Sequence, residues 1–154
     1  MNILFCGGGT CGHISPAIAI ADAMRKKYSN PQIAFIGRKD GKENELTKSA
    51  GYKTFEICVS GLKRSISLEN IKVLKNLLIS IQEVKEIFKK FNPDIVIGTG
   101  GYVSLPALYQ ASKSGIPTVI HESNAVLGLS ARLVANKCNL LLLGADIDTK
   151  YKNA

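Results

Sequence analysis

The chain begins with a short apolar segment that runs directly into a glycine-rich loop and then into a helical stretch. Residues 3–6 read Ile-Leu-Phe-Cys, and Gly-Gly-Gly-Thr-Cys-Gly-His follows at 7–13. Glycines allow backbone N–H groups to approach a ligand with no Cβ in the way. The helix N-terminus behind them carries unpaired N–H donors and the positive end of a dipole. This order of elements favours a bound phosphate or diphosphate, and His13 adds a titratable group beside it.

Strand-like and helix-like segments alternate along the rest of the 154 residues. We predict strands at 3–6, 32–37, 53–59, 94–98, 118–121 and 139–143, and helices at 16–28, 43–50, 67–91, 105–114 and 128–135. Pro16 is expected in the first turn of the first helix, a position that proline favours. The apolar runs at 95–97 and 140–143 do not alternate with polar residues, which is typical of strands covered on both faces. The pattern predicts an α/β fold with a doubly wound, Rossmann-like parallel sheet.

Composition narrows the classes of partner. A formal net charge of +8 favours anionic partners. The four cysteines form no C-x-x-C pair and there are only two histidines, so we expect no metal site and no cofactor. Nucleic acid is not expected, because the lysines are dispersed and no aromatic stacking pattern accompanies them.

Targeting signals are also not visible in the sequence. No apolar run reaches the roughly 18 residues needed to span a bilayer. Met1 leads straight into the first strand without a signal peptide. These two features predict a cytoplasmic location.

Three segments with functional character follow predicted strands, and in such sheets ligands bind beyond the carboxyl ends of the strands. The segments are 7–13, Gly-Thr-Gly-Gly-Tyr-Val-Ser at 98–104 and His-Glu-Ser-Asn at 121–124. We therefore expect them to converge on one site. Glu122 is expected either to accept hydrogens from substrate hydroxyl or amide groups or to form a surface ion pair. Tyr102 either packs under its loop or contacts the ligand.

An alternative reading starts from Gly7, Gly9 and Gly12, which match the G-x-G-x-x-G dinucleotide fingerprint. That fingerprint needs an acidic residue at the end of the second strand for the ribose. The chain has Gly-Arg-Lys at 37–39 instead, and Arg38 is suited to a 2′-phosphate. An NADP-binding oxidoreductase therefore stays open as an alternative.

The predicted helical region 67–91 is both basic and amphipathic. Apolar residues recur at helical spacing, at Ile71, Leu74, Leu78, Ile81, Val84, Phe88 and Phe91. Lysines lie among them, and Lys63 and Arg64 stand just upstream. The pattern fits a core-facing stripe with a solvated lysine face, and it also fits a helix lying on an anionic membrane surface.

Taken together, residues 8–16, 98–104 and 121–124 resemble the bacterial peptidoglycan N-acetylglucosaminyltransferase family, which makes lipid II from lipid I. The resemblance covers essentially the whole chain, and the order and spacing of the three motifs agree. It implies that residues 1–154 are the N-terminal, acceptor-binding half of a B-type glycosyltransferase. The family's C-terminal domain, which binds UDP-N-acetylglucosamine, has no counterpart in this sequence, so we expect no turnover by this chain alone.

The resemblance also implies roles for individual residues. His13 would be the general base that deprotonates the acceptor hydroxyl. The contacts to lipid I and its pyrophosphate would fall on Gly8, Gly9, Thr10, Gly12, Gly100, Gly101, Tyr102, Glu122 and Asn124. The family lies on the inner face of the cell membrane, and the matching membrane-surface residues are Ile71, Leu78 and Ile81, with nearby lysines.

The chain departs from the family's pattern at several positions. Cys11 replaces a glycine, Ser123 a glutamine, Leu127 a proline and Ala131 an asparagine. These changes bear on acceptor affinity, and Lys75 interrupts the membrane-facing stripe. A stand-alone, membrane-recruiting acceptor subunit of a split two-protein glycosyltransferase is the second function that the sequence leaves open.

Overall fold

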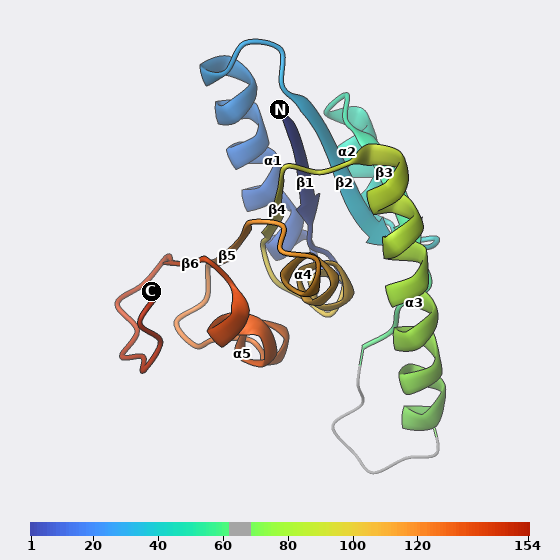
Figure 1. The fold of residues 1–154 in the computed structure, drawn as a ribbon, viewed down its shortest axis with the longest axis vertical. Coiled ribbons are helices and arrows are strands. Elements are labelled where there is room, and N and C mark those ends of the chain that lie inside the picture. The colour runs from blue at the N-terminus through green and yellow to red at the C-terminus, as the bar shows by residue number, and fades with distance from the viewer. Residues whose placement is uncertain (62–68) are drawn as a thin grey trace.

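The computed structural model describes residues 1–61 and 69–154, and in these segments the chain forms a six-stranded parallel sheet (Figure 1). The strand order is β3-β2-β1-β4-β5-β6. The strands are β1 (Asn2–Cys6), β2 (Gln32–Arg38), β3 (Lys53–Ile57), β4 (Ile95–Gly98), β5 (Thr118–Glu122) and β6 (Leu140–Leu143). The helices are α1 (Cys11–Lys27), α2 (Glu43–Ser49), α3 (Glu69–Phe91), α4 (Ser104–Lys113), α5 (Leu129–Val134) and the short 3₁₀ helix η1 (Ala135–Lys137). The predicted doubly wound α/β fold is confirmed.

The helices form two layers, one on each face of the sheet. On one face, α1 buries Ile14 and Ala17 against Phe5 of β1 and its neighbours. On the other face, α3, α4 and α5 pack over a second apolar cluster that includes Val84 and Leu108. Figure 1 shows α1 and α3 on opposite sides of the sheet. Right-handed crossovers explain this, because the direction of strand order reverses between β3 and β4.

The first helix begins earlier than the sequence predicts. Helix α1 starts at Cys11, and Pro16 lies inside it rather than in its first turn. Thr10 has extended backbone (φ −152°, ψ 155°) and ends the loop. Pro16 is tolerated further along because its missing N–H leaves only the Gly12 carbonyl, in the first turn, without its helical partner. The consequence is that His13 lies on the first turn of a regular helix, not on a loose loop.

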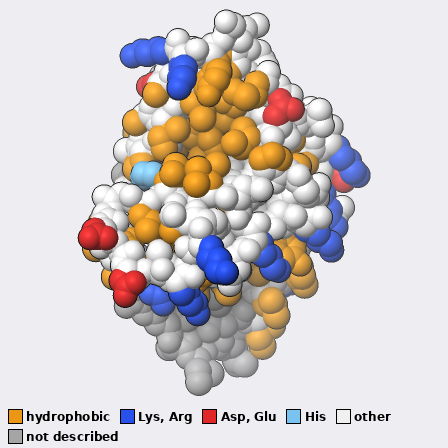
Figure 2. Space-filling view, turned by 60° about the vertical axis from the view of Figure 1, so that its left-hand side comes forward, with side chains coloured by type: hydrophobic (Ala, Val, Ile, Leu, Met, Phe, Trp, Pro, Cys, Tyr) orange, Lys and Arg blue, Asp and Glu red, His pale blue; other side chains and the backbone are white. Residues whose placement is uncertain are grey.

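The expectation that the apolar run at 140–143 is covered on both faces is wrong. Leu140 and Leu142 are 43% and 42% exposed, whereas Leu141 is buried. Leu141 packs on the face that α4 and α5 cover. On the opposite face, the described helices α1 and α2 pack near β1 and its neighbours rather than over β6. Figure 2, turned to bring forward the side on which β6 lies in Figure 1, shows hydrophobic side chains gathered on the surface. Strand β6 therefore alternates in burial although its sequence does not.

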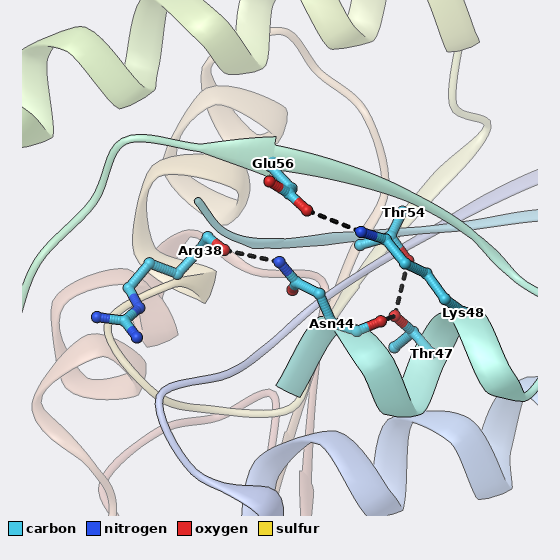
Figure 3. A network of polar contacts seen from close by, with 6 residues as sticks. All are labelled: Arg38, Asn44, Thr47, Lys48, Thr54 and Glu56. Atoms are coloured by element: carbon cyan, nitrogen blue, oxygen red, sulfur yellow. Dashed lines mark hydrogen bonds and ion pairs between the residues drawn. The ribbon is translucent and has the colours of Figure 1, made fainter. Parts of the chain in front are cut away.

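Gly37 in β2 leaves the space that the side chain of Asn44 occupies. A Cβ at position 37 would lie 1.8 Å from Asn44 Oδ1. Asn44 is buried, and its Nδ2 donates a hydrogen bond of 2.7 Å to the carbonyl of Arg38 (Figure 3). We expect Gly37→Ala to displace this side chain and to lower the free energy of unfolding by about 1–3 kcal/mol.

Gly12→Ala is the matched control for this prediction. A Cβ at position 12 would meet only Thr10 Oγ1, at 3.7 Å, and alanine is a better helix former than glycine by about 1 kcal/mol. Urea unfolding should therefore give Gly12→Ala a midpoint at or above that of the parent chain. Equal midpoints for the two variants would contradict the packing argument for Gly37.

Candidate active site at the carboxyl edge of the sheet

The loops that follow β1, β4 and β5 meet at one edge of the sheet. Cys6 pairs with Gly98, so β1 and β4 end at the same level, and β5 runs from Ile120, the partner of Gly98, on to Glu122. The buried Thr99 Oγ1 donates a hydrogen bond of 2.7 Å to the carbonyl of His13, which fastens the second loop to the start of α1. The sequence motif had singled out this segment, but it gave no signal for the role of Thr99.

Two glycines let the second loop pack directly against the first. Gly100 and Gly101 have φ values of +104° and +76°, which favour glycine. A Cβ on Gly100 would lie 2.7 Å from His13 Nδ1, and one on Gly101 would lie 1.9 Å from the carbonyl oxygen of Gly8. A side chain at position 100 would therefore push the second loop away from the imidazole, and one at position 101 would push it away from the first loop.

His13 is half-buried, and its imidazole has an uncommitted nitrogen. Its Nδ1 is buried and has no hydrogen-bond partner among the described residues. The side chain borders a cavity of about 630 Å³. Because the Gly100 backbone closes off Nδ1, the ring nitrogen left to accept a proton from a ligand in that cavity is Nε2.

The cavity brings together some of the predicted site residues and leaves others behind it. It is lined by His13, Gly100, Gly101, Tyr102, Glu122 and Asn124. The first-loop residues Gly8, Gly9, Thr10 and Gly12 lie outside its lining. The first loop therefore supports the cavity wall, because Gly9 packs on Tyr102: a Cβ at position 9 would lie 2.8 Å from the Cε1 of that ring.

An apolar wall, which the sequence analysis did not predict, continues the cavity away from this polar end. The leucines that line it are Leu74 and Leu77 of α3 and Leu129 and Leu133 of α5. Leu74, Leu129 and Leu133 are 60%, 58% and 56% exposed. Large exposed leucines around a cavity mark a binding surface for an apolar group.

Helix α3 divides the predicted amphipathic stripe between two environments. Val84 and Phe88 are buried in the core, as the core-facing interpretation requires. Ile71 and Leu78 are 67% and 64% exposed. Ile81, predicted with them as a membrane-surface residue, is partly buried. The upstream residues 63–64 lie outside the described part of the chain.

Glu122 is neither a free carboxylate nor half of a surface ion pair. It is 1% exposed. Its Oε1 accepts hydrogen bonds from the backbone N–H of Asn124 at 3.0 Å and from Nδ2 of the same residue at 2.6 Å. Its Oε2 accepts the N–H of Gly128 at 2.9 Å. Glu122 reaches the cavity, but most of its acceptor capacity holds the turn that leads into α5. Asn124 is exposed overall, and its side chain is turned toward Glu122.

We expect Glu122→Gln to destabilise the chain by about 1–3 kcal/mol, because the new NH₂ group faces a backbone donor and leaves it unpaired. Thermal or urea unfolding measures this. Glu45→Gln, at an exposed position on α2, is the control and should leave the midpoint unchanged. A Glu122→Gln midpoint equal to that of the control would contradict the structural role.

Cys6, Arg38 and His121 do not line the cavity. Burial raises the pKa of the Cys6 thiol well above its usual range, which makes it a core residue rather than a nucleophile. Arg38, on which the NADP interpretation depends, and His121 are not among the lining residues. Over residues 1–61 and 69–154, no group of three or more metal-ligating side chains comes together. No helix in this range is long and apolar enough to cross a bilayer.

The strand order is that of a Rossmann-type sheet, and the fold matches the N-terminal half of a B-type glycosyltransferase. Residues 3–142 match the glycosyltransferase family 28 N-terminal domain, and the chain belongs to this family.

Solved structures agree with this assignment. The crystal structure of Acinetobacter baumannii MurG superposes with a TM-score of 0.79 at 26% identity, over 92% of this chain and 40% of that one. A calicheamicin glycosyltransferase shares the fold, with a TM-score of 0.61 at 14% identity over 86% of this chain and 36% of its own.

Two relatives with similar sequences have the same name. A protein from a Thermoanaerobacter species is 44% identical over 98% of this chain, and one from Alkaliphilus oremlandii is 46% identical over 98%. Both are called UDP-N-acetylglucosamine--N-acetylmuramyl-(pentapeptide) pyrophosphoryl-undecaprenol N-acetylglucosamine transferase. This chain spans 42% and 41% of their lengths.

Proposed function

We propose that this chain is the acceptor-binding half of an inverting glycosyltransferase that transfers N-acetylglucosamine from UDP-N-acetylglucosamine to lipid I, giving lipid II. The observation that carries the proposal is the cavity, whose polar end holds His13 and the Gly100–Gly101 backbone and whose other wall is apolar. An acceptor with a sugar, a diphosphate and a prenyl chain has the same succession of chemistry. The names of the sequence relatives supply the sugar donor and the acceptor.

In this proposal His13 is the general base. The acceptor hydroxyl gives its proton to the imidazole as its oxygen bonds to the anomeric carbon of the donor. The bond from that carbon to the diphosphate breaks at the same step, UDP leaves, and the configuration inverts. An imidazole suits this task because it changes protonation state near neutral pH. The place of the His13 side chain in the lining of the cavity supports the assignment.

The acceptor's diphosphate would lie against the second glycine loop, where Gly100 and Gly101 line the cavity and α4 begins just beyond them. Backbone N–H groups at a helix start favour an anion. The net charge of +8 adds a long-range attraction for it. Gly8, Gly9, Thr10 and Gly12 lie outside the cavity lining and would act on the acceptor through the wall that the first loop supports. Tyr102 and Asn124 would contact the acceptor.

The membrane part of the proposal places α3 against the inner surface of the cell membrane. Ile71 and Leu78 are exposed on this helix beside the exposed Lys72 and Lys75. Apolar side chains enter the interface while lysines attract anionic lipid. Ile81 would lie at the border of this contact, because it is partly buried. A second domain, which binds the donor, would complete the enzyme in one chain or as a separate subunit.

A transfer assay tests the catalytic assignment. We expect no transfer by this chain alone, and we expect transfer to a water-soluble lipid I analogue once the C-terminal half of the Alkaliphilus oremlandii relative is supplied. His13→Ala should then lower kcat by about 10²–10⁴-fold, the usual contribution of a general base. His121→Ala, at a histidine outside the cavity lining, is the control. Full activity of His13→Ala in the restored enzyme would remove the base assignment.

Vesicle co-sedimentation tests the membrane contact. The double variant Ile71→Ser, Leu78→Ser should bind phosphatidylglycerol vesicles about tenfold more weakly or worse, since each change removes an apolar side chain from the interface. Leu46→Ser, at a 41% exposed position on α2, is the control. High salt should weaken binding further by screening the lysines. Binding that is equal for the double variant and the control would rule out this surface.

A further inference from the structure

A buried carboxylate contacts the first glycine loop but does not line the cavity. Glu43, the first residue of α2, is 7% exposed. Its Oε1 accepts the backbone N–H of Gly9 at 3.0 Å. The two residues are 34 positions apart in the sequence, so this contact joins the β2–α2 turn to the β1–α1 loop.

Glycines on both sides make room for this carboxylate. A Cβ on Gly8, whose φ is +155°, would lie 3.0 Å from Glu43 Oε1. A Cβ on Gly41 would lie 2.8 Å from Glu43 Cδ. Part of the glycine content of the first loop is therefore explained by packing against Glu43 rather than by a ligand.

Helix α2, which carries Glu43, is fastened to two strands (Figure 3). Asn44 donates to the carbonyl of Arg38, and the hydroxyls of Thr47 and Thr54 lie 2.7 Å apart. A further link is the 3.0 Å ion pair of Lys48 with Glu56; the hydrogen bond from Lys48 lowers the pKa of the Glu56 carboxyl. These contacts fix α2 on the sheet, and they therefore fix the position of Glu43 beside the loop.

The held loop in turn supports the cavity wall. Gly9 lies under the Tyr102 ring, and the carbonyl of Gly8 lies against Gly101. Tyr102 and Gly101 line the cavity, and His13 follows the loop on α1. A shift of the first loop would therefore move the surface that an acceptor touches.

We propose that Glu43 is a positioning residue: by accepting the Gly9 N–H it fixes the first glycine loop, and through that loop it sets the places of Tyr102 and His13. The Gly9 amide is then used for structure, and the acceptor's diphosphate is left to the Gly100–Gly101 side of the cavity. The effect on transfer rests on the proposed function; the effect on the loop does not.

Hydrogen–deuterium exchange of the chain without ligand tests the first part. Glu43→Ala should speed the exchange of amides in residues 7–13 by about tenfold or more, the loss of one charge-assisted hydrogen bond. Glu43→Gln should stay close to the parent chain, because its amide oxygen accepts the same N–H. Glu45→Ala, on the exposed side of the same helix, is the control. Unchanged exchange in Glu43→Ala overturns the proposal whether or not the chain binds an acceptor.

Glu43→Asp covers the case in which Glu43→Ala does not fold. It keeps the charge but shortens the reach by one methylene, so exchange in residues 7–13 should accelerate. Unchanged exchange in Glu43→Asp, with the chain folded, contradicts the proposal just as plainly.

Kinetics of the restored enzyme test the second part. We expect Glu43→Ala to lower kcat more than it changes KM for the soluble acceptor analogue, and Glu43→Gln to recover most of the rate. A His13 imidazole NMR signal that moves in Glu43→Ala and returns in Glu43→Gln would trace the effect to the loop. Tighter acceptor binding by Glu43→Ala would overturn the positioning role, because it would mean that the carboxylate competes with the diphosphate for the Gly9 amide. If the parent chain binds no acceptor, the proposed function fails and the exchange result still decides the role of Glu43.

Discussion

The direct contact between the two glycine loops is the constraint on which the site depends. The Thr99 hydroxyl donates a hydrogen bond to the carbonyl of His13, and the backbone of Gly100 lies against the His13 imidazole. Neither contact is possible unless β1 and β4 are neighbours that end at the same level, and their parallel register provides this. The residues that define the cavity therefore follow from strand order first and from side-chain chemistry second.

Two buried glutamates serve the site in the same way. Glu43 accepts a backbone N–H of the first loop, and Glu122 accepts backbone N–H groups of the turn before α5. A buried carboxylate without such partners would be unfavourable, and one that pointed freely into the cavity would repel a diphosphate. Because both accept hydrogen bonds from backbone donors, they order the loops at the edge of the cavity.

Local patterns in the sequence predicted the sheet, the meeting of its loops and the place of His13 among them, whereas the role of His13 as a base stays a prediction. Alternation of segments and glycines after strands are local signals, and they predicted which loops would meet. The start of α1 was misplaced because proline is a statistical marker of a first turn, while the extended backbone at Thr10 decides where this helix begins. The burial of β6 was misjudged because covering a face depends on which helices cross it. Glu43 was missed because its partner, Gly9, is distant in sequence and glutamate at a helix start is ordinary.

The two ends of α3 lie in different environments because the helix is longer than the strands it packs on. Its 23 residues span about 35 Å, whereas the four residues of β4 span about 13 Å. The C-terminal part of the helix packs on the sheet and buries Val84 and Phe88. The N-terminal part runs past the carboxyl edge, as Figure 1 shows, where none of the described strands lies beneath its apolar stripe. The apolar residues that repeat at helical spacing join the core in the C-terminal part of α3. In the N-terminal part, the same repeat places Leu74 and Leu77 in the wall of the cavity. An apolar acceptor chain is thus expected on the side where the helix outruns the sheet, next to the loops that hold His13.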